Sequence, residues 1–108
     1  MGDLPEKMTE YEESLKAGNT LSENTRISYM RDLKKMTTYL REQGVEDCSL
    51  VTPTHLVSYV RELEKEQRSS ATVSRSIASM RAFFRYYVQA GVISANPADS
   101  LKAPPVER

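Results

Sequence analysis

The chain has 108 residues, with 15 basic and 15 acidic side chains, one His, one Cys and no Trp. This length fits one domain, and a domain of this size buries enough surface to fold without a metal or a disulfide. Cys48 has no second cysteine to pair with, and the sequence has neither a secretory leader nor an apolar run long enough to cross a membrane. We therefore expect a cytoplasmic protein with no membrane partner, and 39% hydrophobic residues argue against a disordered chain.

The net charge of zero conceals a segregation of charge along the chain. Residues 1–21 carry two bases and five acids, whereas residues 22–43 carry five bases and three acids. Residues 44–69 are acidic again, and residues 70–90 carry three Arg and no acid. Two basic segments are therefore separated by an acidic one, so the overall charge does not exclude a nucleic-acid partner.

Apolar side chains that recur every three or four residues predict four helices and no strand. The first helix begins after Asp3 and stops at Gly18-Asn19. The second begins at its cap Ser22 and ends at Gly44.

The third helix has Thr52 as its cap and Pro53 in its first turn, and it fades near residue 67. The fourth begins at Ser69 or Ser70 and stops at Gly91. Four amphipathic helices with short connections indicate an all-α fold, a compact bundle of four main helices.

Each helix carries one apolar stripe at helical spacing, which predicts its buried side. The predicted core consists of Met8, Tyr11, Leu15, Tyr29, Leu33, Met36, Leu40, Leu56, Tyr59, Val60, Leu63, Val73, Ile77, Met80, Phe84, Tyr87 and Val88.

Residues 96–108 contain three of the five prolines and follow the fourth helix. A residue before proline favours extended backbone, so this segment, with its Ala-Pro-Pro at 103–105, is predicted to be an extended exit rather than another long helix. The sequence thus divides into a helical domain over residues 1–95 and a linker over residues 96–108.

The exposed faces of the second and fourth helices each begin with small polar residues and continue with Arg or Lys. Hydroxyl groups, free backbone N–H groups and the positive end of the helix dipole favour phosphate oxygens. Arg75 is predicted to project clear of the core, with Ser79 beside it, and a long Arg can reach the edge of a guanine. Ile27 is apolar on a polar face, which a contact with a thymine methyl group would explain.

Other polar residues that could suggest catalysis are explained by non-catalytic roles. His55 lies in the first turn of the third helix, where a surface role is expected, and Cys48 in a polar turn is expected to be an inert thiol. No His/Cys cluster has metal-ligand spacing, so we expect neither a metal site nor a cofactor.

Two segments resemble the signatures of tyrosine recombinases, the phage integrases. Residues 22–33 read SENTRISYMRDL, similar to the S-x-N-T-x-x-x-Y-x-x-D-L pattern that opens the second helix of the family. Residues 70–86 resemble its fourth helix, with the pattern T-x-x-R-x-(I/L)-x-x-(I/M/V)-R-x-(F/L)-(F/Y). Residues 96–104 look like the family's link into its catalytic domain. The resemblance covers nearly the whole chain and is closest to the Xer-like or transposon-integrase branch.

The resemblance implies an N-terminal core-binding domain with a SAM-like helical fold. In the family this domain and the catalytic domain close around duplex DNA at a recombination half-site, with the second and fourth helices across the major groove. The implied partners are double-stranded DNA, the chain's own C-terminal catalytic domain and neighbouring recombinase protomers, and the implied location is the bacterial cytoplasm at the nucleoid. Residues 96–108 would then lead into a catalytic domain that is absent from this chain.

The resemblance also implies which residues meet DNA. Arg75 is the candidate for a base contact, and Lys34, Lys35 and Arg81 are candidates for phosphate contacts. The full set of candidate DNA-binding residues is Asn24, Thr25, Ser28, Arg31, Lys34, Lys35, Thr72, Arg75, Ser79 and Arg81.

The chemistry of these recombinases is not expected in this chain. The H-x-x-R motif of the family is missing, because the only His is His55 and Ser58 stands three residues later. We therefore expect no catalytic residue here. Two alternatives to a DNA-binding module remain: a helical protein-interaction bundle that uses the acidic first helix, and an independent enzyme, which the lack of a nucleophile–base pair disfavours.

Overall fold

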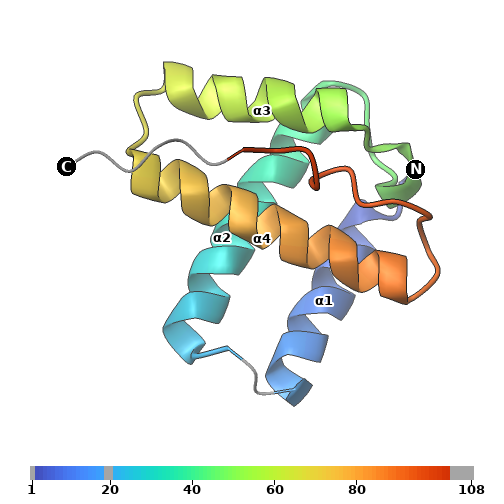
Figure 1. Cartoon of the computed structure of the whole chain (residues 1–108). Coiled ribbons are helices and arrows are strands. Elements are labelled where there is room, and N and C mark those ends of the chain that lie inside the picture. Colours follow the sequence, from blue (N-terminus) through green and yellow to red (C-terminus); the bar gives the residue numbers. More distant parts are fainter. Residues whose placement is uncertain (1, 19–20, 103–108) are drawn as a thin grey trace.

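A computed structural model describes residues 2–18 and 21–102, and in these residues it contains helices and no strand. The helices are α1 (Leu4–Gly18), α2 (Glu23–Glu42), α3 (Pro53–Lys65) and α4 (Ser70–Gln89), with a short 3₁₀ turn, η1 (Cys48–Leu50), before α3 (Figure 1). The predicted all-α class and the four main helices are confirmed. Asn19, one half of the predicted stop of α1, lies outside the described residues.

Serine side chains cap the two helices that carry the basic segments. Ser22 Oγ accepts a hydrogen bond from the backbone N–H of Thr25 at 3.2 Å, and Ser69 Oγ accepts one from that of Thr72 at 3.1 Å. Each bond satisfies one of the free N–H groups at a helix start and contributes about 1 kcal/mol. The cap of α4 is therefore Ser69 rather than Ser70.

His55 is part of the cap of α3. Its backbone N–H donates to Thr52 Oγ1, and its ring Nδ1 accepts from the backbone N–H of Thr52 at 3.1 Å. The two residues thus form a reciprocal capping box. The prediction that His55 has a first-turn surface role is confirmed.

Helix α2 is the centre of the bundle, since it contacts α1, α3 and α4, and α3 also packs against α4. In Figure 1, α4 crosses α2, and the start of α4 lies on the opposite side of α2 from α1. In this view α2 begins at the lower left and α4 at the upper left, so both helices begin on the left side of the molecule.

The core agrees with most of the predicted stripes. Tyr29, Val60 and Val88 are only half-buried, while Met30 and Phe83 are buried at 4% and 0% exposure without having been predicted. The core is completed by residues outside the four main helices, namely Val45, Cys48, Val51, Ala98 and Leu101.

Residues 96–102 pack against α4 instead of extending away from it. Residues 97–100 form turns, and the Asn96 side chain donates from Nδ2 to the backbone carbonyl of Arg81 at 3.1 Å. Ala98 and Leu101 are buried. The prediction that no long helix follows α4 is confirmed as far as residue 102, but an extended path is wrong for residues 96–102, because two apolar side chains gain burial by folding back. Residues 103–105 lie outside the described residues.

Candidate nucleic-acid interface

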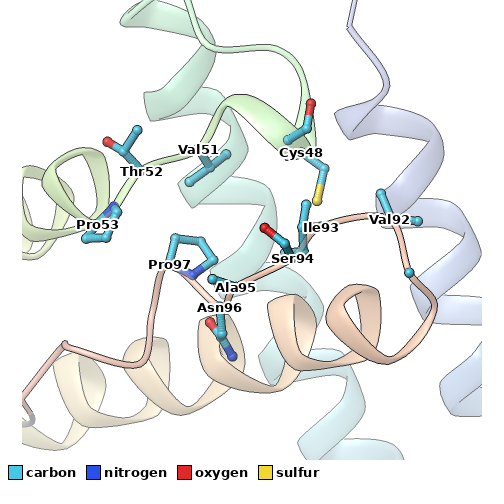
Figure 2. Close-up of a pocket in the computed structure, with 12 residues that line it drawn as sticks. Cys48, Val51, Thr52, Pro53, Val92, Ile93, Ser94, Ala95, Asn96 and Pro97 are labelled. Atoms are coloured by element: carbon cyan, nitrogen blue, oxygen red, sulfur yellow. The ribbon is translucent and has the colours of Figure 1, made fainter.

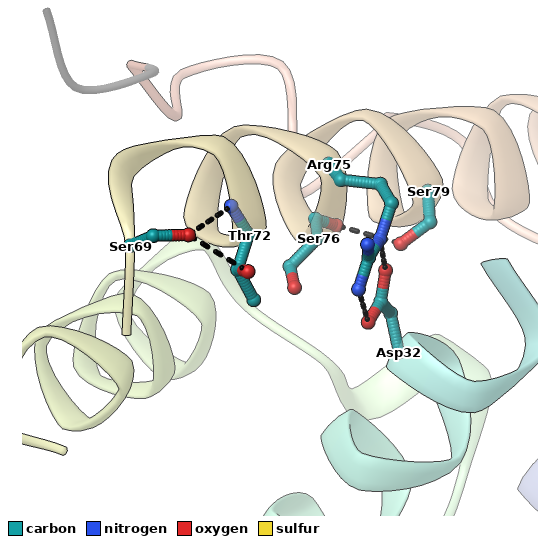
Figure 3. A network of polar contacts seen from close by, with 6 residues as sticks. All are labelled: Asp32, Ser69, Thr72, Arg75, Ser76 and Ser79. Atoms are coloured by element: carbon teal, nitrogen blue, oxygen red, sulfur yellow. Dashed lines mark hydrogen bonds and ion pairs between the residues drawn. The ribbon is translucent and has the colours of Figure 1, made fainter. Parts of the chain in front are cut away.

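An ion pair joins the two helices that carry the candidate residues. The guanidinium of Arg75 on α4 donates from Nε to Asp32 Oδ2 at 2.8 Å and from Nη2 to Asp32 Oδ1 at 3.1 Å (Figure 3). The side chain of Asp32 is 8% exposed and that of Arg75 is 41% exposed. The carboxylate raises the pKa of Arg75, mainly through these hydrogen bonds. Arg75 is exposed as predicted, but it is bound to a buried partner.

The prediction that Ser79 is exposed is wrong. Ser79 is completely buried, and its hydroxyl donates to the backbone carbonyl of Ser76 at 2.7 Å. Ser76 is also buried, and both lie on the side of α4 that meets Asp32 of α2 (Figure 3). Small side chains here allow the two helices to approach closely, so the serines act in packing.

The other polar candidates of α2 and α4 are at least partly accessible. Asn24 is exposed, while Thr25, Ser28 and Thr72 are half-buried. Thr72 Oγ1 accepts a hydrogen bond from the capping serine, Ser69, at 3.0 Å. Successive helical residues are 100° apart, so Asn24, Ser28 and Arg31 follow Asp32 around α2 toward solvent. These residues border the ion pair on the α2 side.

The three candidate cations of α2 differ in what they contact. Arg31 and Lys34 are exposed and form no ion pair with any residue in the described ranges. Lys35 Nζ lies 3.1 Å from Glu66, a carboxylate at the end of α3 that also binds Arg68. Hydrogen bonds from the two cations hold the pKa of Glu66 below its usual range. Of these three cations, Arg31 and Lys34 are therefore more available to an anionic ligand than Lys35.

The side chain of Arg81 makes hydrogen bonds within the chain. Its Nε donates to the backbone carbonyl of Ala98 at 3.3 Å, and its Nη2 donates to that of Leu101. The guanidinium thus anchors residues 96–102 to α4. A phosphate contact from Arg81 would have to replace these bonds, which makes it a weaker candidate than Arg31 or Lys34.

A hollow lies between η1, the start of α3 and residues 91–97 (Figure 2), and none of the candidate DNA-binding residues lines it. It has a volume of about 700 Å³, and no charged side chain of residues 2–18 or 21–102 lines it. The Cys48 thiol at its edge is 1% exposed, and burial raises its pKa to about 11. A thiol with so high a pKa is a poor nucleophile, in agreement with the prediction of an inert Cys48.

Neither a metal site nor a membrane segment is found within residues 2–18 and 21–102. No group of three or more His, Cys, Asp or Glu side chains gathers there around a point that could hold a metal ion. None of the helices in this part of the chain is long and apolar enough to cross a membrane.

Asp32 is the functional candidate that sequence reasoning missed. The sequence contains a signal for it, because Asp32 lies at the edge of the apolar stripe of α2, where an acid is costly unless it is paired. Its partner could not be identified from one helix alone, since the pairing depends on how α2 and α4 cross.

Three curated relatives illustrate the similarity to known proteins. A protein of Caldanaerobacter subterraneus subsp. tengcongensis, named as tyrosine recombinase TTE1313, is 37% identical over 99 residues, which cover 92% of this chain and 34% of the relative. Tyrosine recombinase XerC of Stutzerimonas stutzeri is 30% identical, with 97% of this chain and 35% of the relative covered. XerC of Listeria monocytogenes is 32% identical, with 89% and 31% covered.

This chain spans about a third of the length of these relatives. No solved structure matches it. The family model of the phage integrase N-terminal SAM-like domain matches residues 8–91. The matched region includes all of α2, α3 and α4 and most of α1. This protein therefore belongs to the phage integrase N-terminal SAM-like domain family.

Proposed function

We propose that this chain is the DNA-binding module of a site-specific tyrosine recombinase, which holds the major groove of a recombination half-site with α2 and α4. The observation that carries the proposal is the pairing of these two helices through Asp32 and Arg75, with the exposed cation Arg31, which has no ion pair within the described residues, on the adjoining surface of α2. We call this surface the groove face. It consists of Asn24, Thr25, Ser28, Arg31 and Lys35 of α2 and Thr72 and Arg75 of α4, with Lys34 at its margin.

The groove face has the chemistry that duplex DNA requires. Arg31 and Lys34 can neutralise phosphates, and the starts of α2 and α4 present backbone N–H groups and a positive dipole on the same side of the molecule (Figure 1). The acidic helix α1 lies on the other side of α2 from the start of α4. This arrangement supports one orientation on DNA, with the acids turned away from it.

Binding by this module alone is expected to be weak. About three phosphate contacts correspond to a log–log salt slope on the order of −3, and affinities near physiological salt are then about micromolar. A catalytic domain on the opposite face of the DNA raises the effective concentration of the module and so tightens its binding.

The proposal assigns strand cleavage and rejoining to that catalytic domain, into which residues 96–108 lead. Residues 1–95 then form the DNA-binding unit, on whose core residues 96–102 pack, and neighbouring recombinase protomers are further partners at the recombination site. The names and bacterial sources of the relatives support this division, as does their threefold greater length. A protein that recombines bacterial DNA works in the cytoplasm, at the nucleoid.

Fluorescence anisotropy with a labelled duplex of random sequence tests the proposal. We expect R31A to weaken binding and to reduce the magnitude of the salt slope by about 1, because one phosphate contact is lost. R61A is the matched control, since Arg61 on α3 is also an exposed helical arginine without an ion pair in the described chain. R61A should leave affinity and slope unchanged.

Equal effects of R31A and R61A would contradict the groove face, because only the overall charge would then matter. An absence of binding even at low salt would contradict DNA binding itself. In that case the helical protein-interaction bundle, with its acidic α1, becomes the better interpretation.

A further inference from the structure

The ion pair between Asp32 and Arg75 leaves part of the arginine free. An arginine side chain has five N–H donors, and the two bonds to Asp32 use one on Nε and one on Nη2. Three donors remain, on Nη1 and Nη2. The Arg75 side chain is 41% exposed, and its hydrogen bonds to other described residues are the two to Asp32, so these donors are left for a ligand on the groove face.

The free donors form a fork at the end of the guanidinium. One N–H of Nη1 and one of Nη2 are parallel, and this spacing matches the O6 and N7 acceptors of guanine in the major groove. The bonds to Asp32 occupy the side of the guanidinium and leave this end free (Figure 3). We propose that Arg75 reads a guanine in the recombination half-site and that Asp32 is the positioning residue that aims it, an inference that rests on the proposed function.

The charge of the pair favours a base over a phosphate. Asp32 compensates the positive charge of Arg75, so the pair attracts a phosphate less than a free cation such as Arg31 does. Guanine O6 and N7 are neutral acceptors, which need directed donors rather than net charge. Among the ion pairs within residues 2–18 and 21–102, this one alone has a carboxylate less than 10% exposed. Because a buried carboxylate moves less than an exposed one, the geometry of the Asp32–Arg75 pair is the best defined of these ion pairs.

Holding the Arg75 side chain in place before DNA binds also increases its discrimination between base pairs. A flexible Arg loses rotamer freedom when it binds, whereas Arg75 is already held by two bonds in the folded chain. A held fork cannot turn to follow the different acceptor pattern of another base pair. Asp32 therefore contributes to specificity without touching DNA.

Selection of binding duplexes from a random library by the 108-residue chain tests the inference. We expect the wild type to enrich a guanine at one position, and replacement of that base by 7-deazaguanine to weaken binding about tenfold or more, since one acceptor of the fork is lost. R75K keeps the charge but lacks the fork, so it should lose the preference at that position while it still binds DNA.

D32N separates positioning from a merely structural role. We expect it to bind random DNA more tightly, with a steeper salt slope, because the charge of Arg75 is released, and yet to lose the guanine preference. E66Q is the matched control, since it removes a carboxylate from the other ion pair between elements, that of Lys35 with Glu66. E66Q should keep the guanine preference.

The outcomes are distinguishable. DNA binding with a guanine preference that R75K retains would overturn the inference and leave the proposed function intact. A uniform loss of affinity across all sequences in R75A, with a salt slope smaller by about 1, would identify a phosphate contact and also overturn it. No enrichment of any duplex at low salt would contradict the proposed function. A D32N variant that folds and keeps the guanine preference would overturn the positioning role of Asp32. If D32N does not fold, as judged by circular dichroism, R75K and 7-deazaguanine still decide whether Arg75 reads a guanine, and D32E, which keeps the charge but displaces the carboxylate, tests the positioning.

Discussion

At the scale of single residues, burial and pairing decide what a polar group does. The hydroxyl of Tyr59 on α3 is buried and has no hydrogen-bond partner among the described residues, whereas that of Tyr87 on α4 donates to the backbone carbonyl of Lys7 at 2.6 Å. Burial raises the pKa of both phenols. The two tyrosines are thus alike in burial and opposite in hydrogen bonding.

We expect Y59F and Y87F to change stability in opposite directions. Y59F removes a hydroxyl that is buried without a partner, so the free energy of unfolding should stay the same or rise by about 1 kcal/mol. Y87F leaves the Lys7 carbonyl without its donor and should lower it by about 1 kcal/mol. Urea denaturation of both variants measures the difference, and a loss of stability in Y59F would show that its hydroxyl has a partner.

Arg75 shows the limit of prediction for a single residue. Helical projection correctly turned it away from the apolar stripe, but the projection of one helix contains no information about its neighbours. Asp32 becomes its partner only because α2 and α4 cross at that point. The exposed position could be predicted from the sequence, and the ion pair could not.

At the scale of helices, α4 is buried over a wider arc than its apolar stripe. The sequence predicted one buried side, with Val73, Ile77 and Phe84, and this side is confirmed. The adjoining side, with Ser76 and Ser79, is buried as well, because α4 packs against both α2 and α3. Serine is common on surfaces and in close helix contacts, so its burial could not be predicted from residue type.

A large side chain at Ser79 should therefore separate the two helices. We expect S79L to lower the free energy of unfolding by about 3 kcal/mol or more, since there is no space for the added atoms. A78L is the control, because Ala78 precedes it on α4 and is exposed. A78L should change stability by less than about 0.5 kcal/mol. Equal stability of the two variants in urea denaturation would contradict the close contact.

At the scale of the whole molecule, the C-terminal segment is part of the helical core. Ala98 and Leu101 are buried with the helices, and Arg81 and Asn96 connect residues 96–102 to α4. Prolines indicated correctly that no long helix follows α4 in residues 90–102. The return path depends on contacts distant in sequence, which local patterns do not encode.

Replacement of Arg81 should loosen this segment. We expect R81A to lower the free energy of unfolding by about 2 kcal/mol, because the carbonyls of Ala98 and Leu101 lose a charged donor. Arg85, one turn later on α4, is exposed and without an ion pair in the described chain, so R85A is the control and should have little effect. Hydrogen exchange at residues 96–102 should accelerate in R81A alone, and unchanged exchange would mean that apolar burial holds the segment by itself.

The fold packs together the two helices that contain the basic segments of a chain whose net charge is zero. Net charge is zero, yet α2 and α4 begin on the same side of the molecule, and Arg31 and Lys34 have no acidic partner within the described residues. The segregation of charge along the chain could be predicted from the sequence. The meeting of the two basic helices was implied only by the family resemblance, since the crossing depends on tertiary packing.

The most direct test of the account is a titration of the ¹⁵N-labelled chain with a short duplex, followed by backbone chemical shifts at two salt concentrations. The account predicts shifts at residues 22–35 and at the first turns of α4, weaker at the higher salt concentration. Shifts at the acidic face of α1, or none on addition of DNA at low salt, would contradict it.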